Sequence, residues 1–112
     1  MAVSRSLISG NTAMLILQLL SEKDMYGYEM IDTLSRRSKN VFELKVGTLY
    51  PLLHSLVQAG YLVSYDEEVS GKLRKYYQIT PNGKIYLSKM IDEWKTYANA
   101  VAGMIGGVSY ES

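Results

Sequence analysis

The sequence predicts a mainly α-helical domain of the α+β class, with three helices, a two-stranded hairpin and a long last helix. Apolar residues recur at helical spacing through residues 11–60, and the pattern changes to alternation on both sides of Ser70-Gly71. From Leu87 onward, apolar residues fall three and four positions apart, as in a helix that packs along its length. Three helices followed by a basic-tipped hairpin is the element order of a winged helix-turn-helix.

The composition limits what the chain can be. It has 112 residues, 47% hydrophobic and 21% charged, which fits one globular domain. With no cysteine and one histidine, we expect no metal and no cofactor. Since no apolar run can span a bilayer and no signal peptide is recognisable, we expect a cytoplasmic protein that does not bind membranes. The net charge is only +1, so nucleic-acid binding depends on how charge is distributed.

The chain divides into three segments. Residues 1–9 are predicted to form an N-terminal arm, with Arg5 as its charged side chain. Residues 10–80 form the predicted winged helix-turn-helix. Residues 81–112 form the predicted C-terminal dimerisation helix and a short tail.

Two helices are predicted before the central one. The first begins at Asn11 or Thr12, either of which can cap it, and ends near Leu20. After a polar break at residues 21–25, the second covers about Tyr26–Ser38. Cations cluster in its last turn and just after it, where they suit the negative end of a helix dipole or could touch flanking phosphates. These cations are Arg36, Arg37, Lys39 and Lys45.

The third helix, within Val46–Leu62, organises the domain. One face carries leucines at positions 49, 52, 53 and 56. Because proline lacks an N–H, Pro51 is expected in the first turn, which places the start at residues 45–48, and Gly60 is the expected stop. This helix is either a packing helix or a DNA-reading helix. Its opposite face is neutral and mostly polar, with Thr48, Pro51, His54, Ser55 and Gln58, and Tyr50 at its flank.

Alternating patterns predict strands at Tyr61–Asp66 and Leu73–Thr80, joined by a glycine-containing turn. Cations lie at and behind the turn, whereas acidic residues gather elsewhere, notably at residues 66–68. Thr80 and Pro81 then begin the last helix, as N-cap and first helical residue.

The last helix carries a heptad seam that is longer than one small domain needs for its own core. Such a seam is most simply buried against the same helix of a second copy, so we predict a homodimer. The predicted interface comprises Leu87, Met90, Ile91, Trp94, Tyr97, Ala98, Val101 and Met104.

Three stretches resemble signatures of the PadR-type transcriptional regulators: GYEM at Gly27–Met30, GTLYPLLHSLVQAGYL at Gly47–Leu62 and RKYYQITPNG at Arg74–Gly83. The resemblance covers residues 10–90. The short single C-terminal helix is similar to the compact branch of that family, which includes multidrug-sensing repressors. The resemblance implies a homodimer on a palindromic operator in double-stranded DNA, usually repressing, and released by a small planar aromatic or lipophilic effector.

A reading helix would enter the major groove with its N-terminal half. His54 lies further along the same face, and Tyr50 can equally be a packing tyrosine. The first-choice DNA contacts are Lys45, Gly47, Thr48 and Tyr50.

The hairpin would contact the DNA backbone or minor groove through Lys72, Arg74 and Lys75. Lys72 and Arg74 share a strand face, which favours that pair. Arg5 is a further, weaker candidate. The alternative is a hairpin that is merely solvated.

Trp94 occupies a seam position where two copies would approach each other. If packing leaves a gap, the two indoles could sandwich a flat apolar ligand, as the resemblance to multidrug-sensing relatives implies. Leu15, Leu19, Met90 and Tyr97 would line or close that site. The alternative is that Trp94 is simply interface core, where aromatic residues are enriched.

Two rival functions follow from the same sequence. An enzyme is disfavoured because no nucleophile–base pair, phosphate loop, metal spacing or carboxylate pair is convincing. A winged helix used only for protein contact, without an effector, is the other rival, since a fold does not dictate its function.

Overall fold

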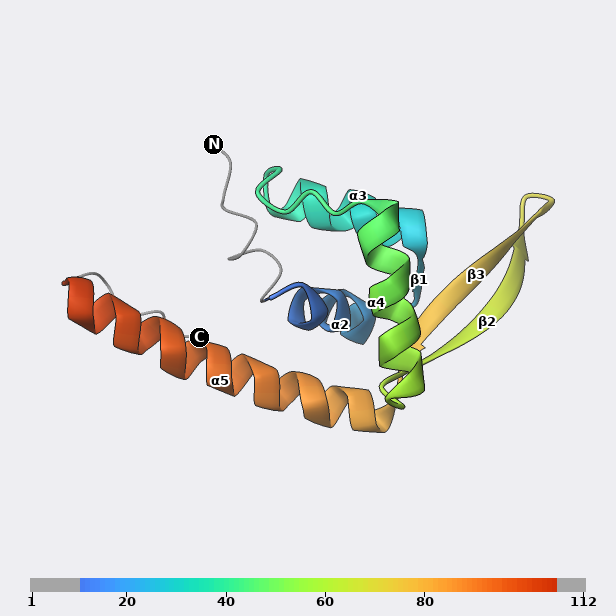
Figure 1. Cartoon of the computed structure of the whole chain (residues 1–112). Coiled ribbons are helices and arrows are strands. Elements are labelled where there is room, and N and C mark those ends of the chain that lie inside the picture. Colours follow the sequence, from blue (N-terminus) through green and yellow to red (C-terminus); the bar gives the residue numbers. More distant parts are fainter. Residues whose placement is uncertain (1–10, 107–112) are drawn as a thin grey trace.

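The computed structural model describes residues 11–106 and has the predicted architecture, mainly helical with a small antiparallel sheet (Figure 1). We call the hairpin of β2 and β3 the wing; it and the far end of α5 project from the helical body in opposite directions (Figure 1). Within the described range no helix is both long and apolar enough to cross a bilayer. The elements are α2 (Thr12–Glu22), β1 (Met25–Tyr26), α3 (Gly27–Arg37), α4 (Val46–Gln58), β2 (Leu62–Val69), β3 (Lys72–Ile79) and α5 (Pro81–Ile105).

The core lies where the apolar faces of the helices meet the sheet. Leu49 and Leu53 of α4 are fully buried and Leu56 nearly so, as predicted, whereas Leu52 is half-buried. Each fully buried leucine contributes about 1.5–3 kcal/mol of transfer free energy, which fixes the rotation of α4 and leaves its polar face in solvent. The other large, fully buried side chains are Ile16, Leu17, Leu20, Met30 and Leu62.

The start of α4 differs from the prediction at Pro51. The helix begins at Val46 after the N-cap residue Lys45, so Pro51 lies in the second turn and not the first. The first turn closes upstream, where the N–H groups of Thr48 and Leu49 donate to the Lys45 carbonyl at 3.0 and 2.9 Å. Pro51 removes only the helical donor to the Gly47 carbonyl, and Gly47 is exposed, where water can replace that donor.

The end of α4 matches the prediction. Gly60 has a φ of 86°, the left-handed conformation that glycine adopts readily. Its N–H donates to the Val57 carbonyl at 3.0 Å, and the Tyr61 N–H donates to the Leu56 carbonyl at 2.9 Å. These two bonds form a Schellman motif, which satisfies the last carbonyls of α4 and turns the chain into β2.

The sheet contains one strand that the sequence prediction missed. β1 pairs with β3 through Met25↔Tyr77 and Tyr26↔Tyr76, so the strand order is β1-β3-β2. Two residues are too few to show an alternating pattern, and they lie at the junction of the predicted polar break and second helix. β2 and β3 are antiparallel and turn at Ser70-Gly71, as predicted.

α5 begins as predicted, with Thr80 as N-cap and Pro81 in the first turn. The Thr80 hydroxyl accepts from the Gly83 N–H at 3.0 Å and donates to the Gly60 carbonyl at 2.7 Å. The Thr80 N–H donates to the Tyr61 carbonyl at 3.0 Å. One threonine therefore ties the start of α5 to the end of α4.

α5 packs on the body along its first half. Leu87 is 6% exposed and belongs to the core, and Met90 and Ile91 pack against that core. Leu87, which was predicted to lie in a dimer interface, is thus buried by its own chain. The helix ends at Ile105, where Gly106 adopts a left-handed φ of 77°.

Candidate nucleic-acid interface

The exposed face of α4 carries most of the residues predicted to read DNA. Gly47, Thr48, Pro51 and His54 are all exposed, opposite the buried leucines. Lys45, at the N-cap, is exposed and adds a positive charge at the start of the helix. A neutral, polar helix face suits hydrogen bonding to base edges, whereas contacts to phosphate favour cations.

Tyr50 is half-buried and packs against α3. A β-carbon at Gly27 would overlap Tyr50 Oη and lie 2.8 Å from its Cζ, so the ring lies directly on the α3 backbone. This contact favours the packing role for Tyr50, the alternative that the sequence left open. It also explains why a glycine stands at the first position of α3.

Gly47 has open space above it. It is an exposed helical residue, and a β-carbon there would meet no described atom within 4 Å. Glycine inside a helix costs up to about 1 kcal/mol relative to alanine. No contact within the described chain accounts for that cost, whereas close approach of another molecule's backbone would.

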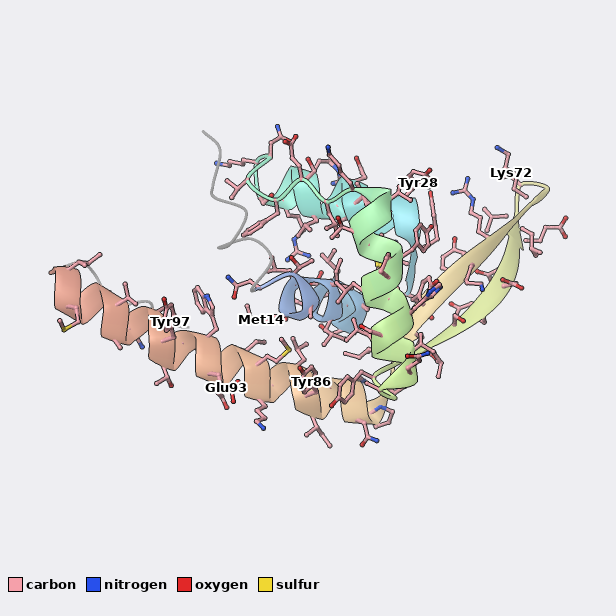
Figure 2. The ribbon with its side chains drawn as sticks, in the orientation of Figure 1. Met14, Tyr28, Lys72, Tyr86, Glu93 and Tyr97 are labelled. Carbon is pink, nitrogen blue, oxygen red and sulfur yellow. The ribbon has the colours of Figure 1, made fainter. Side chains whose placement is uncertain are left out.

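The wing is balanced in charge rather than basic. In the β2–β3 register Asp66 faces Lys75 and Glu67 faces Arg74, so the acids lie across the hairpin from the cations. In the sequence the acids and the cations lie in separate clusters. Their pairing across the hairpin depends on the strand register, which the sequence pattern alone did not show. Lys72 faces Val69 and is the wing cation without an acid opposite it. Figure 2 shows Lys72 at the tip of the wing.

Arg74 is partly withdrawn into an aromatic contact. Its guanidinium carbon lies 4.3 Å from the centroid of the Tyr26 ring, a cation–π contact with β1. Its Nε is buried and has no hydrogen-bond partner within the described residues. Lys72 and Arg74 share a strand face as expected, but Arg74 packs on the body. Lys72 and Lys75 are the exposed cations of the wing.

The arginines at the end of α3 are held in ion pairs. Arg36 Nη2 lies 3.0 Å from Asp32 Oδ2, and Arg37 Nη1 lies 2.6 Å from Glu22 Oε1. The hydrogen bond from Arg37, and then that from Gln18, lowers the pKa of Glu22 below its ordinary value. These pairs favour a local electrostatic role for both arginines. Arg5, the remaining predicted contact, lies outside the described residues.

A cavity of about 330 Å³ lies between α2 and α5, within the size range of small-molecule sites. Trp94 and Leu15, two of the residues named above for an effector site between two copies, both line this cavity within one chain. Met14, Phe42 and Ile91 also line it, and Figure 2 shows Met14 between the two helices. Met14 and Phe42 were not predicted for this site. They come from α2 and from the loop that precedes α4, and only the fold shows that both segments lie beside α5.

Three other residues predicted for the effector site do not line this cavity. Leu19 is 3% exposed and borders a neighbouring cavity of about 260 Å³. Met90 packs against the core. Tyr97 is 67% exposed. The predicted set therefore spans the core, the cavity and the surface rather than one site.

The far end of α5 presents an uncovered apolar stripe. Val101 and Met104 are 40% and 87% exposed, and Tyr97 and Ile105 are exposed as well. Ala98 is half-buried. The seam that was predicted from spacing thus divides into a first half used by the chain itself and an uncovered second half.

Tyr28 is an exposed side chain that the sequence reasoning did not single out. It lies in the first turn of α3 and is 64% exposed. In Figure 2 it points away from α5, as Lys72 does. Its only signal in the sequence was its position inside the GYEM stretch.

Two successive helices, α3 and α4, a polar exposed face on the second and a β-hairpin wing after it define a winged helix-turn-helix DNA-binding protein. The chain belongs to the PadR-like family of transcriptional regulators, whose family model matches residues 16–89. This membership confirms the family suggested by the three sequence stretches. It also agrees with the prediction that the protein is not an enzyme.

Individual relatives agree with this assignment. The chain is 30% identical over 95 residues to a transcriptional regulator of Mycobacterium tuberculosis, covering 85% of this chain and 83% of that protein. A transcriptional regulator from Clostridium thermocellum superposes with a TM-score of 0.82 at 34% identity, covering 88% of this chain and 96% of that one. A PadR family regulator from Eggerthella lenta gives 0.80 at 30% identity, covering 89% and 86%.

Proposed function

We propose that the protein is a cytoplasmic repressor that binds a palindromic operator as a homodimer and is released by a small planar aromatic or lipophilic molecule. The observation that carries the DNA-binding part is the exposed, neutral face of α4 with Gly47 open at its start. The repressing role rests on the resemblance to multidrug-sensing relatives.

In this proposal α4 enters the major groove with Thr48 toward the base edges and the Gly47 backbone close to a phosphate. Lys45 contacts the backbone beside it. The wing reaches the flanking backbone or minor groove through Lys72 and Lys75, the two exposed wing cations. Each phosphate contact adds salt-dependent affinity that does not depend on sequence.

The second copy is proposed to cover the apolar stripe at the end of α5. Tyr97, Val101 and Met104 repeat at intervals of four and three, the spacing with which two helices pack along a seam. A two-fold dimer would present two copies of α4 to half-sites about 34 Å apart, one turn of DNA.

The effector is proposed to bind in the cavity that Trp94 and Leu15 line. That cavity adjoins the stripe, since Trp94 lies three residues, about one helical turn, before Tyr97 on α5. A ligand that binds better when α5 has shifted against α2 would change the spacing of the two α4 helices and lower operator affinity.

One titration tests DNA binding together with the release of DNA by a ligand. The probe is a planar tricyclic aromatic dye, added to the protein on an operator selected from a random DNA pool. Trp94 is the only tryptophan, so its fluorescence reports the cavity directly. We expect the dye to quench Trp94 and release the DNA, and Trp94→Ala to bind the same DNA but resist release.

The matched control is Glu93→Ala. Glu93 neighbours Trp94 on α5 but points away from α2 (Figure 2). The dye should therefore release DNA from this variant as readily as from the wild type. If the dye releases DNA from the Trp94→Ala variant at the same concentration as from the wild type, the effector site is contradicted and the DNA-binding proposal stays intact.

A further inference from the structure

We propose that Asp24 is a positioning residue for the wing: its carboxylate joins both wing strands to the segment before β1 and presets the angle at which the wing meets DNA. This inference rests on the proposed DNA contact of the wing. It assigns to Asp24 no contact with DNA of its own.

Asp24 lies between α2 and β1 and is half-buried. Its Oδ2 accepts a 2.6 Å hydrogen bond from the Tyr65 hydroxyl on β2 and a 3.3 Å bond from Gln78 Nε2 on β3. The hydrogen bond to Asp24 raises the pKa of Tyr65 to about 12, so the phenol remains a donor at neutral pH. One carboxylate oxygen thus holds both strands at the base of the wing.

Aromatic rings form a layer beside this carboxylate. Tyr65 stacks on Tyr76 with centroids 5.8 Å apart, and Tyr76 meets the edge of Tyr26 at 5.5 Å. The Arg74 guanidinium lies over the same Tyr26 ring. Because Tyr26 belongs to β1, these ring contacts pack the base of the wing against the body.

Beyond this layer the wing stands free. Residues 66–73 are all exposed. Lys72 is four residues along β3 from Tyr76, a distance of about 13 Å in an extended strand. A rotation of about 15° at the base would move Lys72 by about 3 Å, enough to lose a phosphate contact. The contacts at the base therefore control where the tip cations lie.

The test removes the Tyr65 hydroxyl and keeps its ring. We expect Tyr65→Phe to weaken operator binding about fivefold to tenfold, because a loosened wing spends less time in the competent orientation. The slope of affinity against salt should stay as in the wild type, since the bound complex keeps its phosphate contacts. Asp24→Ala should cause a similar loss, and the two changes together should cost no more than Asp24→Ala alone.

The control is Tyr86→Phe. Tyr86 also stacks on a tyrosine, Tyr61, with centroids 4.2 Å apart, but it lies on α5 away from the wing (Figure 2). Its DNA affinity should equal that of the wild type, and thermal unfolding of all variants shows whether any loss reflects general destabilisation.

A wing without its exposed cations separates this inference from the DNA-binding proposal. In a Lys72→Ala/Lys75→Ala background, adding Tyr65→Phe should cause no further loss of affinity. A further fivefold loss there would overturn the positioning role, as would unchanged affinity of Tyr65→Phe in the wild-type background. Wild-type affinity of the double lysine variant would contradict the proposed wing contact itself, and the positioning role with it.

Discussion

Replacing Gly83 by alanine is expected to lower the free energy of unfolding by about 2 kcal/mol or more. The added β-carbon would overlap the Tyr61 carbonyl oxygen and lie 2.7 Å from Ile79 Cγ1. The carbonyl is not free to move aside, because it accepts the Thr80 N–H that ties β2 to the start of α5. Relief of the overlap therefore requires α5 to move as a whole, against the packing of Leu87 in the core.

Gly103→Ala is the matched control for this prediction, since both glycines lie within α5. A β-carbon at Gly103 would meet no described atom within 4 Å, so helix propensity should raise stability there by up to about 1 kcal/mol. Thermal unfolding should show Gly83→Ala about 10 °C below the wild type and Gly103→Ala at or above it. Equal melting temperatures for the two variants would contradict the close packing at the α4–α5 junction.

Met104→Glu is expected to split the proposed dimer and reduce operator affinity by about a hundredfold or more. Met104 is 87% exposed in the single chain, so the fold itself has no need of it. A charge in a buried seam between two copies would be costly to desolvate. A monomer binds one half-site alone and loses the high effective concentration of the linked second half-site, which is commonly worth a factor of 10² or more.

Sedimentation velocity and a gel-shift titration measure the two parts of this result. The control is Ile85→Glu, which adds the same charge to another exposed apolar position on α5, 70% exposed and outside the heptad spacing. It should remain a dimer with wild-type affinity. A wild-type protein that sediments as a monomer, or a Met104→Glu variant that remains a dimer, would contradict the proposed assembly.

Much of the fold could be predicted because its signals are local. The leucine face of α4, the stop at Gly60 and the Thr80-Pro81 start of α5 each depend on residues within a few positions of one another. The wing could be placed for the same reason, from alternation on both sides of one glycine-containing turn. These elements were enough to define the winged helix-turn-helix.

The features that escaped prediction depend on contacts between distant segments. β1 forms because Met25 and Tyr26 pair with residues of β3 that lie about fifty positions later in the chain. The acids of the wing lie opposite its cations only because of the register of the hairpin. The packing of Tyr50 on Gly27 is also visible only in three dimensions. Pro51 was misplaced because a lost helical bond is cheap where the freed carbonyl faces solvent.

The same distinction applies to the candidate site. Thr48, His54 and Lys72 are exposed where a DNA-reading protein would present them, because helix and strand periodicity determine the direction of a side chain. Arg74 lies on the predicted strand face, but its guanidinium packs on Tyr26. That contact could not be predicted, because Tyr26 lies on β1, a strand that the sequence did not reveal. Trp94 was predicted to lie on a dimer seam, and in the single chain it lines a cavity whose other walls come from α2 and Phe42.

The operator affinity of Gly47→Ala, measured at one fixed salt concentration, tests most directly whether α4 reads DNA. The alanine methyl enters space that is open in the described chain, so the fold should become more stable by up to about 1 kcal/mol. We predict that operator affinity nevertheless falls about tenfold, because the methyl occupies the space through which the DNA backbone approaches the helix. Gly103→Ala should leave affinity unchanged. A Gly47→Ala variant that is more stable and binds the operator as tightly as the wild type would contradict the assignment of α4 as the reading helix.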